Sequence, residues 1–177
     1  ATWAAQGRSF DGDDDMLDLR VGAVAPSQLT FTSSQPWTFG VWLNRSTQAA
    51  AVRALAGDYD LLPILLVADG THQYCYGFRN SAGSYFYLLA DASAYNGIWA
   101  YVEWIADGAG NLDLRINGAS VASTVCTTTF DIETIGRCHS SFLYSYAGVM
   151  GDILVHNHAL SASEGLHNYL VTKWRYS

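Results

Sequence analysis

The sequence predicts an all-β protein, an antiparallel sandwich of two sheets with one short helix near the C-terminus. Turn signals recur at short intervals, and the segments between them are β-branched or aromatic with period-two alternation. The dipeptide Asn117-Gly118 favours the positive φ angles of a tight hairpin turn. Ser161 and Glu164 match a capping box, which predicts that a helix starts there.

The predicted strands follow one another along most of the chain. Gly7 to Leu19 is expected to form a strand, an acidic turn over Asp11 to Asp15, and a second strand. Further strands are expected over residues 38–43, 62–67, 72–79, 85–89, 99–105, 112–116 and 119–125. Asp69-Gly70 is a strong turn dipeptide between two of these strands.

Alternation along the strands and spacing along the helix predict which side chains are buried. On the strand over 99–105, one face carries Trp99, Tyr101 and Ile105, and the other carries Ala100, Val102 and Trp104. Both faces are therefore expected to be covered. In the helix, Leu166, Leu170 and Trp174 recur at helical spacing and are predicted to dock on a sheet edge, with the charge of Lys173 pointing outward.

Length and composition favour a single domain over residues 1–177. The chain has 177 residues, half of them apolar and 14% aromatic, while only 14% are charged, against about 25% in average soluble proteins. The net charge is −7 with no Lys/Arg cluster, which argues against nucleic-acid binding. The longest apolar stretch, over 61–68, is far below the roughly 20 residues that span a bilayer, so no membrane insertion is expected. The first ten residues are not typical of a signal peptide.

Cysteine content leaves two interpretations open. Cys75, Cys126 and Cys138 cannot all pair within the chain, and none shows C-x-x-C spacing. Cys126 and Cys138 form a disulfide if their strands are neighbours. Otherwise all three are reduced, mostly buried thiols.

Several segments, taken in order, resemble one known superfamily. They are GRSFDGDDDMLDL from Gly7, WTFGVWL from Trp37, LDLRING from Leu112, TIGR from Thr134 and AGVMGDILVHNHALSASE from Ala147. In this order they resemble the concanavalin A-like lectin/glucanase superfamily, specifically its laminin-G-like and pentraxin-like branch. The resemblance implies a jelly-roll of two antiparallel sheets. It does not transfer a function, because this fold hosts lectins, adhesion domains, virion proteins and some hydrolases.

The sequence argues against an enzyme. Retaining glycoside hydrolases need two carboxylates about 5–5.5 Å apart, and the hydrolases of this superfamily carry them as Glu-x-Asp-x-x-Glu on one strand. No such run is present; the nearest acids are Asp131, Glu133 and the isolated Glu103. A glycoside hydrolase of the laminarinase type is therefore kept only as an alternative.

Two segments have the composition of metal sites. Asp11, Asp13 and Asp14 offer carboxylates to calcium, which takes six to eight oxygen ligands. The competing interpretation is that these acids only shape the turn. His156 and His158 share a strand face, but a third ligand is missing locally, which favours a structural role.

Aromatic and small polar residues in two loops predict a shallow glycan- or partner-binding site. These residues are Tyr95, Asn96, Phe142, Tyr144 and Tyr146. Aromatic faces stack on sugar C–H surfaces, and hydroxyl and amide groups orient sugar hydroxyls. The alternative is that these rings close the end of the sandwich or form a subunit contact.

The sequence therefore predicts a non-catalytic recognition or assembly module at a surface. One hypothesis is a lectin-like domain that binds a glycan or glycoprotein. The other is a structural subunit of a virion or particle surface, of decoration or fibre type, whose partners are sister subunits or shell proteins. Either role predicts an extracellular or virion-surface location.

Overall fold

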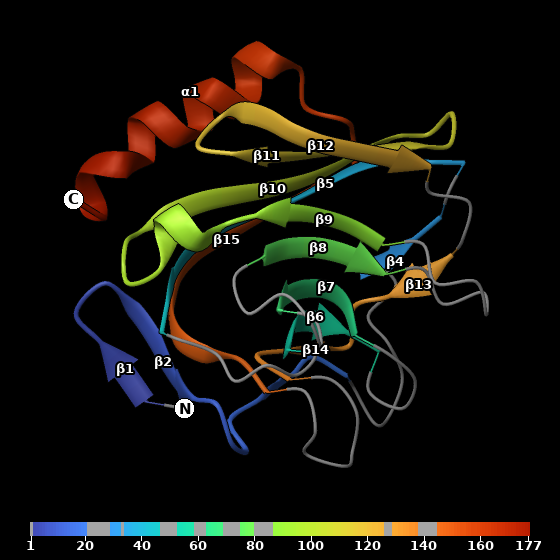
Figure 1. The fold of residues 1–177 in the computed structure, drawn as a ribbon. Coiled ribbons are helices and arrows are strands. Elements are labelled where there is room, and N and C mark those ends of the chain that lie inside the picture. The colour runs from blue at the N-terminus through green and yellow to red at the C-terminus, as the bar shows by residue number, and fades with distance from the viewer. Residues whose placement is uncertain are drawn as a thin grey trace.

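The computed structural model describes residues 2–20, 29–32, 34–46, 53–58, 63–68, 75–79, 87–125, 129–137 and 145–177. Within these residues the chain forms two antiparallel sheets, a two-stranded ribbon and one α-helix, α1 (Ala162–Thr172), near the C-terminus (Figure 1). This confirms the predicted fold class. No helix in the described ranges is long and apolar enough to cross a membrane.

The larger sheet has seven strands in the order β1-β2-β15-β5-β10-β11-β12. Their bounds are β1 Thr2–Ala4, β2 Gly7–Asp11, β15 Ala147–His156, β5 Pro36–Arg45, β10 Ala100–Asp107, β11 Asn111–Ile116 and β12 Ala119–Val125. The long strands β5 and β10 lie at its centre and pair over eight consecutive residues, from Ala100 opposite Leu43 to Asp107 opposite Pro36. This sheet carries the candidate site described below.

The second sheet has six strands in the order β3-β14-β6-β7-β8-β9. Their bounds are β3 Leu17–Asp18, β14 Thr134–Ile135, β6 Arg53–Gly57, β7 Pro63–Ala68, β8 Cys75–Arg79 and β9 Tyr87–Asp91. A separate ribbon pairs β4 (Thr30–Phe31) with β13 (Phe130–Asp131). The six-stranded sheet lies against the inner face of the larger one (Figure 1).

The acidic turn connects two sheets. The predicted strands on either side of it exist as β2 and β3, but β2 pairs with β1 and β15, whereas β3 pairs with β14. The predicted order of strand, acidic turn and strand is therefore present, but the two strands do not pair with each other as a hairpin. Local sequence signals a turn but does not specify which neighbour each strand pairs with.

The main core lies between the sheets and follows the predicted alternation. On β5 and β10, every second side chain is buried in one large apolar cluster. These side chains are Trp37, Phe39, Val41, Leu43, Ala100, Val102, Trp104 and Ala106. On β10 the intervening Tyr101 and Glu103 are also fully buried, because α1 covers the outer face of the sheet.

The helix starts as predicted but presents a different face. Ser161 and Glu164 form the full capping box. Leu166, Leu170 and Trp174 are 43%, 45% and 72% exposed, and of the three only Leu166 lies against the β11–β12 hairpin, at Gly118, so the prediction that this row docks on the sheet is wrong.

The face that packs is one residue out of phase with the predicted one. It carries Gly165, Tyr169, Thr172 and Tyr176. Gly165 lets the helix lie close to the sheet at Glu103, because a Cβ at this position would lie 2.6 Å from Glu103 Oε2. Both sets of residues recur at helical spacing, so periodicity alone does not fix the phase.

The hairpin between β11 and β12 supports the same helix. Asn117 and Gly118 have φ of 53° and 82°, as the turn prediction requires. The Asn117 side chain accepts a hydrogen bond from the Tyr101 backbone N–H at 2.9 Å. Gly118 lies directly against Leu166, which explains why a side chain would be crowded there.

Candidate functional site: an aromatic surface beside the C-terminal helix

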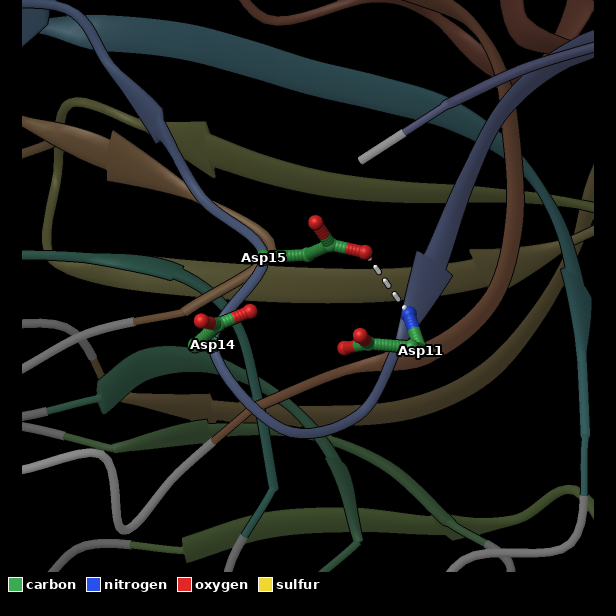
Figure 2. A group of neighbouring side chains, drawn as sticks. All are labelled: Asp11, Asp14 and Asp15. Carbon is green, nitrogen blue, oxygen red and sulfur yellow. Dashed lines mark hydrogen bonds between the residues drawn. The ribbon is translucent and has the colours of Figure 1, made fainter.

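The acidic turn brings three carboxylates together. Asp11, Asp14 and Asp15 each place one carboxylate oxygen within 4.8 Å of the others. Figure 2 shows Asp15 accepting a hydrogen bond from the Asp11 backbone N–H, at 2.9 Å. The side chain of Asp13 does not join this group. The backbone N–H of Asp13 donates a hydrogen bond to Asp11 Oδ1, and the backbone carbonyl of Asp13 accepts one from the Ser145 hydroxyl. Asp15 is thus the third carboxylate, and the calcium prediction for Asp11, Asp13 and Asp14 stays untested.

Tyr95 and Asn96 lie at the end of a single 3-10 turn, η2 (Ser93–Tyr95). The turn is held by Arg45, whose guanidinium donates to the Ala92 carbonyl at 2.6 Å and whose own carbonyl accepts from Gly97 N–H at 2.9 Å. Tyr95 is half-buried against the main core. These two residues are therefore fixed in position, but one side of the Tyr95 ring is used for packing.

The other loop of the predicted glycan site is only partly described. Phe142 and Tyr144 lie outside the described residues, as do Cys126 and Cys138. Tyr146 is 0% exposed in the main core, edge-on to Phe10 with ring centroids 5.9 Å apart. Its hydroxyl donates to the Val149 carbonyl at 3.2 Å. The prediction that Tyr146 lines a surface site is therefore wrong, because its ring helps to fill the sandwich.

The surroundings of His156, His158 and Glu103 favour a structural role for these residues over a role in metal binding or catalysis. The rings of His156 and His158 lie 5.4 Å apart, but among the described residues only the acidic turn brings three ligand atoms within 4.8 Å. Burial, and then the charge of His158, lower the pKa of His156. Glu103 is fully buried beneath Gly165, out of reach of a substrate, and burial raises its pKa against the opposing effect of Arg115.

A cluster of aromatic rings lies on the outer side of the larger sheet. The sequence did not predict these rings as a site. We call it the C-terminal aromatic surface; it comprises Trp42, Trp99, Tyr169, Trp174 and Tyr176. Trp42 stacks on Tyr176 with centroids 4.5 Å apart and on Tyr169 at 5.7 Å. Trp99 packs against Tyr176 at 4.7 Å.

Hydrogen bonds fix the orientation of these rings. Trp42 Nε1 donates to Thr172 Oγ1, and Trp174 Nε1 donates to the Val171 carbonyl, both at 2.9 Å. The Tyr176 hydroxyl accepts from Asp152 N–H at 2.7 Å. Each polar group of these three rings is therefore bound within the protein, and the exposed parts present apolar ring surface.

The aromatic surface borders a pocket of about 510 Å³, within the size range of small-ligand sites. Its walls also include Leu170, Lys173 and Ser177. Lys173 Nζ lies 5.7 Å from the centroid of the Tyr169 ring. Trp174 is 72% exposed at its rim and presents a large apolar surface, whereas Trp37, Trp42 and Trp104 are buried.

The family follows from comparison of the sequence with known proteins. The sequence profile described as the concanavalin A-like lectin/glucanases superfamily matches residues 20–164, which is more than half of the chain. The protein therefore belongs to this superfamily, as the motif order predicted. Among curated proteins, none is significantly similar to it in sequence.

Solved structures show the same jelly-roll fold. A candidate carbohydrate-binding protein from Bacteroides ovatus ATCC 8483 matches with a TM-score of 0.73 and 16% identity, over 94% of this chain and 47% of that chain. The botulinum neurotoxin serotype G binding domain gives 0.63 and 10%, over 91% and 46%. The SAP-like pentraxin from Limulus polyphemus gives 0.58 and 14%, over 89% and 78%. The chain spans about half the length of the first two, and these identities show the fold alone.

Proposed function

We propose that this domain is a non-catalytic carbohydrate-recognition module that binds a glycan on the C-terminal aromatic surface. The observation that carries the proposal is the exposed Trp174 ring beside a pocket walled by Trp99 and Tyr169. Such rings offer flat apolar faces to sugar C–H groups, while Lys173 and Ser177 supply polar contacts at the rim.

The structural neighbours support the class of ligand. One is a candidate carbohydrate-binding protein, and another is the binding domain of a neurotoxin. A binding role also fits the burial of Glu103, which removes one of the carboxylates that a hydrolase would need. An extracellular location is part of this proposal. The loop site around Tyr95 and Asn96, the particle-surface role and calcium binding stay predictions.

The experiment is a glycan array followed by calorimetric titration of the best binder. Trp174→Ala is expected to weaken binding at least tenfold, about 1.4 kcal/mol, because the stacking face is lost. Leu166→Ala is the matched control, since Leu166 is an exposed apolar residue on α1, the helix that precedes Trp174, but lies outside the pocket. Absence of any glycan ligand, or equal binding by the Trp174 variant, would contradict the proposal.

A further inference from the structure

A second groove adjoins the C-terminal aromatic surface. It has a volume of about 450 Å³ and lies between the hairpin of β1 and β2 and the chain end around Arg175. We call it the N-terminal groove. Its walls include Trp3, Gln6, Arg8, Asp152 and Tyr176. Tyr176 also lines the first pocket, so one ring separates the two hollows.

The Tyr176 ring and its neighbours form a ridge between the two hollows, which we call the Tyr176 ridge, and hydrogen bonds hold this ridge together. Gln6 Oε1 accepts from Trp99 Nε1 at 2.9 Å, and Gln6 Nε2 donates to the Arg175 carbonyl at 2.7 Å. The N-terminal hairpin, the start of β10 and the chain end are therefore held next to one another. The two hollows have a defined relative position.

Each hollow has one strongly exposed tryptophan. Trp3 is 82% exposed and lines the N-terminal groove, and Trp174 is 72% exposed and lines the pocket. No other large apolar side chain in the described ranges exceeds 56%. Two separate stacking faces on either side of a ridge suit a chain of sugar units better than one unit.

Three cationic side chains line the two hollows. Two of them, Lys173 and Arg175, are exposed. Arg8 lines the N-terminal groove with its guanidinium 5.5 Å from the centroid of the Trp3 ring. Against these three cations the two hollows contain one acidic side chain, Asp152, which pairs with Arg175. This is unexpected in a chain of net charge −7 and favours an anionic ligand.

We infer that the ligand is an acidic oligosaccharide, bearing uronic acid, sialic acid or sulfate groups, that crosses the Tyr176 ridge. One unit stacks on Trp174 and a more distant one on Trp3, while Lys173 and Arg8 lie near the acidic groups. This inference rests on the proposed function and extends it, because it names the ligand's charge and its minimum length.

The test starts from a glycan array with acidic and neutral oligosaccharides of several lengths. The best acidic binder is then titrated calorimetrically as fragments of two to eight units, and as its carboxyl-reduced or desulfated form. We expect affinity to rise at least tenfold with length and to fall at least fivefold on neutralising the sugar or on raising salt from 50 to 300 mM.

Variants assign these effects to the two hollows. Trp3→Ala is expected to remove the gain with length and to leave the affinity of the shortest fragment unchanged. Lys173→Gln is expected to weaken acidic but not neutralised ligands, and Arg20→Gln, outside both hollows and paired with Asp18, is the charge control. Both tested side chains are exposed, and unchanged thermal melts would confirm that each variant is folded.

The outcomes separate this inference from the proposed function. A neutral or very short glycan that binds as tightly as the long acidic one, and that still depends on Trp174, overturns the inference and leaves the proposed function intact. Unchanged long-chain affinity in the Trp3 variant also overturns it. Absence of any glycan ligand overturns both.

Discussion

The two faces of the seven-stranded sheet use their tryptophans differently. On the inner face, Trp37 and Trp104 are 2% and 0% exposed and belong to the main core. On the outer side, Trp42 is buried beneath Tyr176, Trp99 is half-buried, and Trp174 projects into solvent. Tryptophan side chains on the inner face stabilise the sandwich. On the outer side their exposure increases from the buried Trp42 to the exposed Trp174, which lies on the proposed binding surface.

The largest effect is expected on the inner face. Trp104→Ala removes a fully buried ring that contacts Phe39 at a centroid distance of 6.3 Å. We expect a loss of about 3–5 kcal/mol in the free energy of unfolding, because both burial and packing are lost. Urea denaturation measures this loss. A loss below about 1 kcal/mol would show that the inner face is not the main source of stability.

The next effect tests how closely the helix approaches the outer face. Gly165→Ala places a methyl group 2.6 Å from Glu103 Oε2, so either the buried Glu103 carboxyl or the helix has to shift. We expect a loss of about 1–3 kcal/mol in the same assay, despite the better helix propensity of alanine. The double variant Gly165→Ala with Glu103→Ala should be less destabilised than the sum of the two single variants. Strict additivity would contradict the contact.

Trp99→Ala tests how much a half-buried tryptophan of the outer side contributes to the stability of the fold. Because Trp99 is half-buried and has a hydrogen bond to Gln6, we expect a loss of about 1–2 kcal/mol, smaller than for Trp104. Thermal denaturation of the two variants side by side makes the comparison. A loss for Trp99 as large as that for Trp104 would mean that the outer cluster is a second structural core.

Glu103→Gln probes the buried carboxyl on the outer face. Burial raises the folded-state pKa of Glu103 above the usual value of 4.5, so its protonated form stabilises the folded protein. That stabilisation is complete below the unfolded pKa and is lost as pH rises through the folded pKa. The variant should therefore gain stability relative to the parent as pH rises from about 4. Unfolding curves at pH 4 to 8 test this; a constant difference between the two proteins would contradict it.

The smallest effect is expected on the exposed helix face. Leu170→Ser removes a side chain that is 45% exposed, so we expect a change within about 0.5 kcal/mol. A loss comparable to that of Gly165→Ala would show that this face is covered in the native protein.

The features that could be predicted from the sequence depend on interactions between residues that are close together in the chain. Alternation along β5 and β10, the Asn117-Gly118 turn and the Ser161 cap each depend on residues close together in the chain. The prediction of the helix phase was wrong because Gly165 and Leu166 both begin a row at helical spacing, and contacts with Glu103 and Trp42, distant in sequence, favour the row that begins at Gly165.

The candidate site was missed for a related reason. Its rings come from β5, from the residue before β10 and from the C-terminal segment over 169–176, and the groove beside it is formed partly by the N-terminal hairpin. No motif connects these segments in the sequence. The exposed state of Trp174 is a tertiary property, because it depends on the face that the helix presents.

The most direct test of the proposed binding site follows the six tryptophan indole N–H signals by NMR while the best glycan is added. We expect the signals of Trp174 and Trp99 to shift and those of Trp37 and Trp104 to stay in place. A bound glycan that moves none of the outer-side indoles would contradict the assignment of the C-terminal aromatic surface as the binding site.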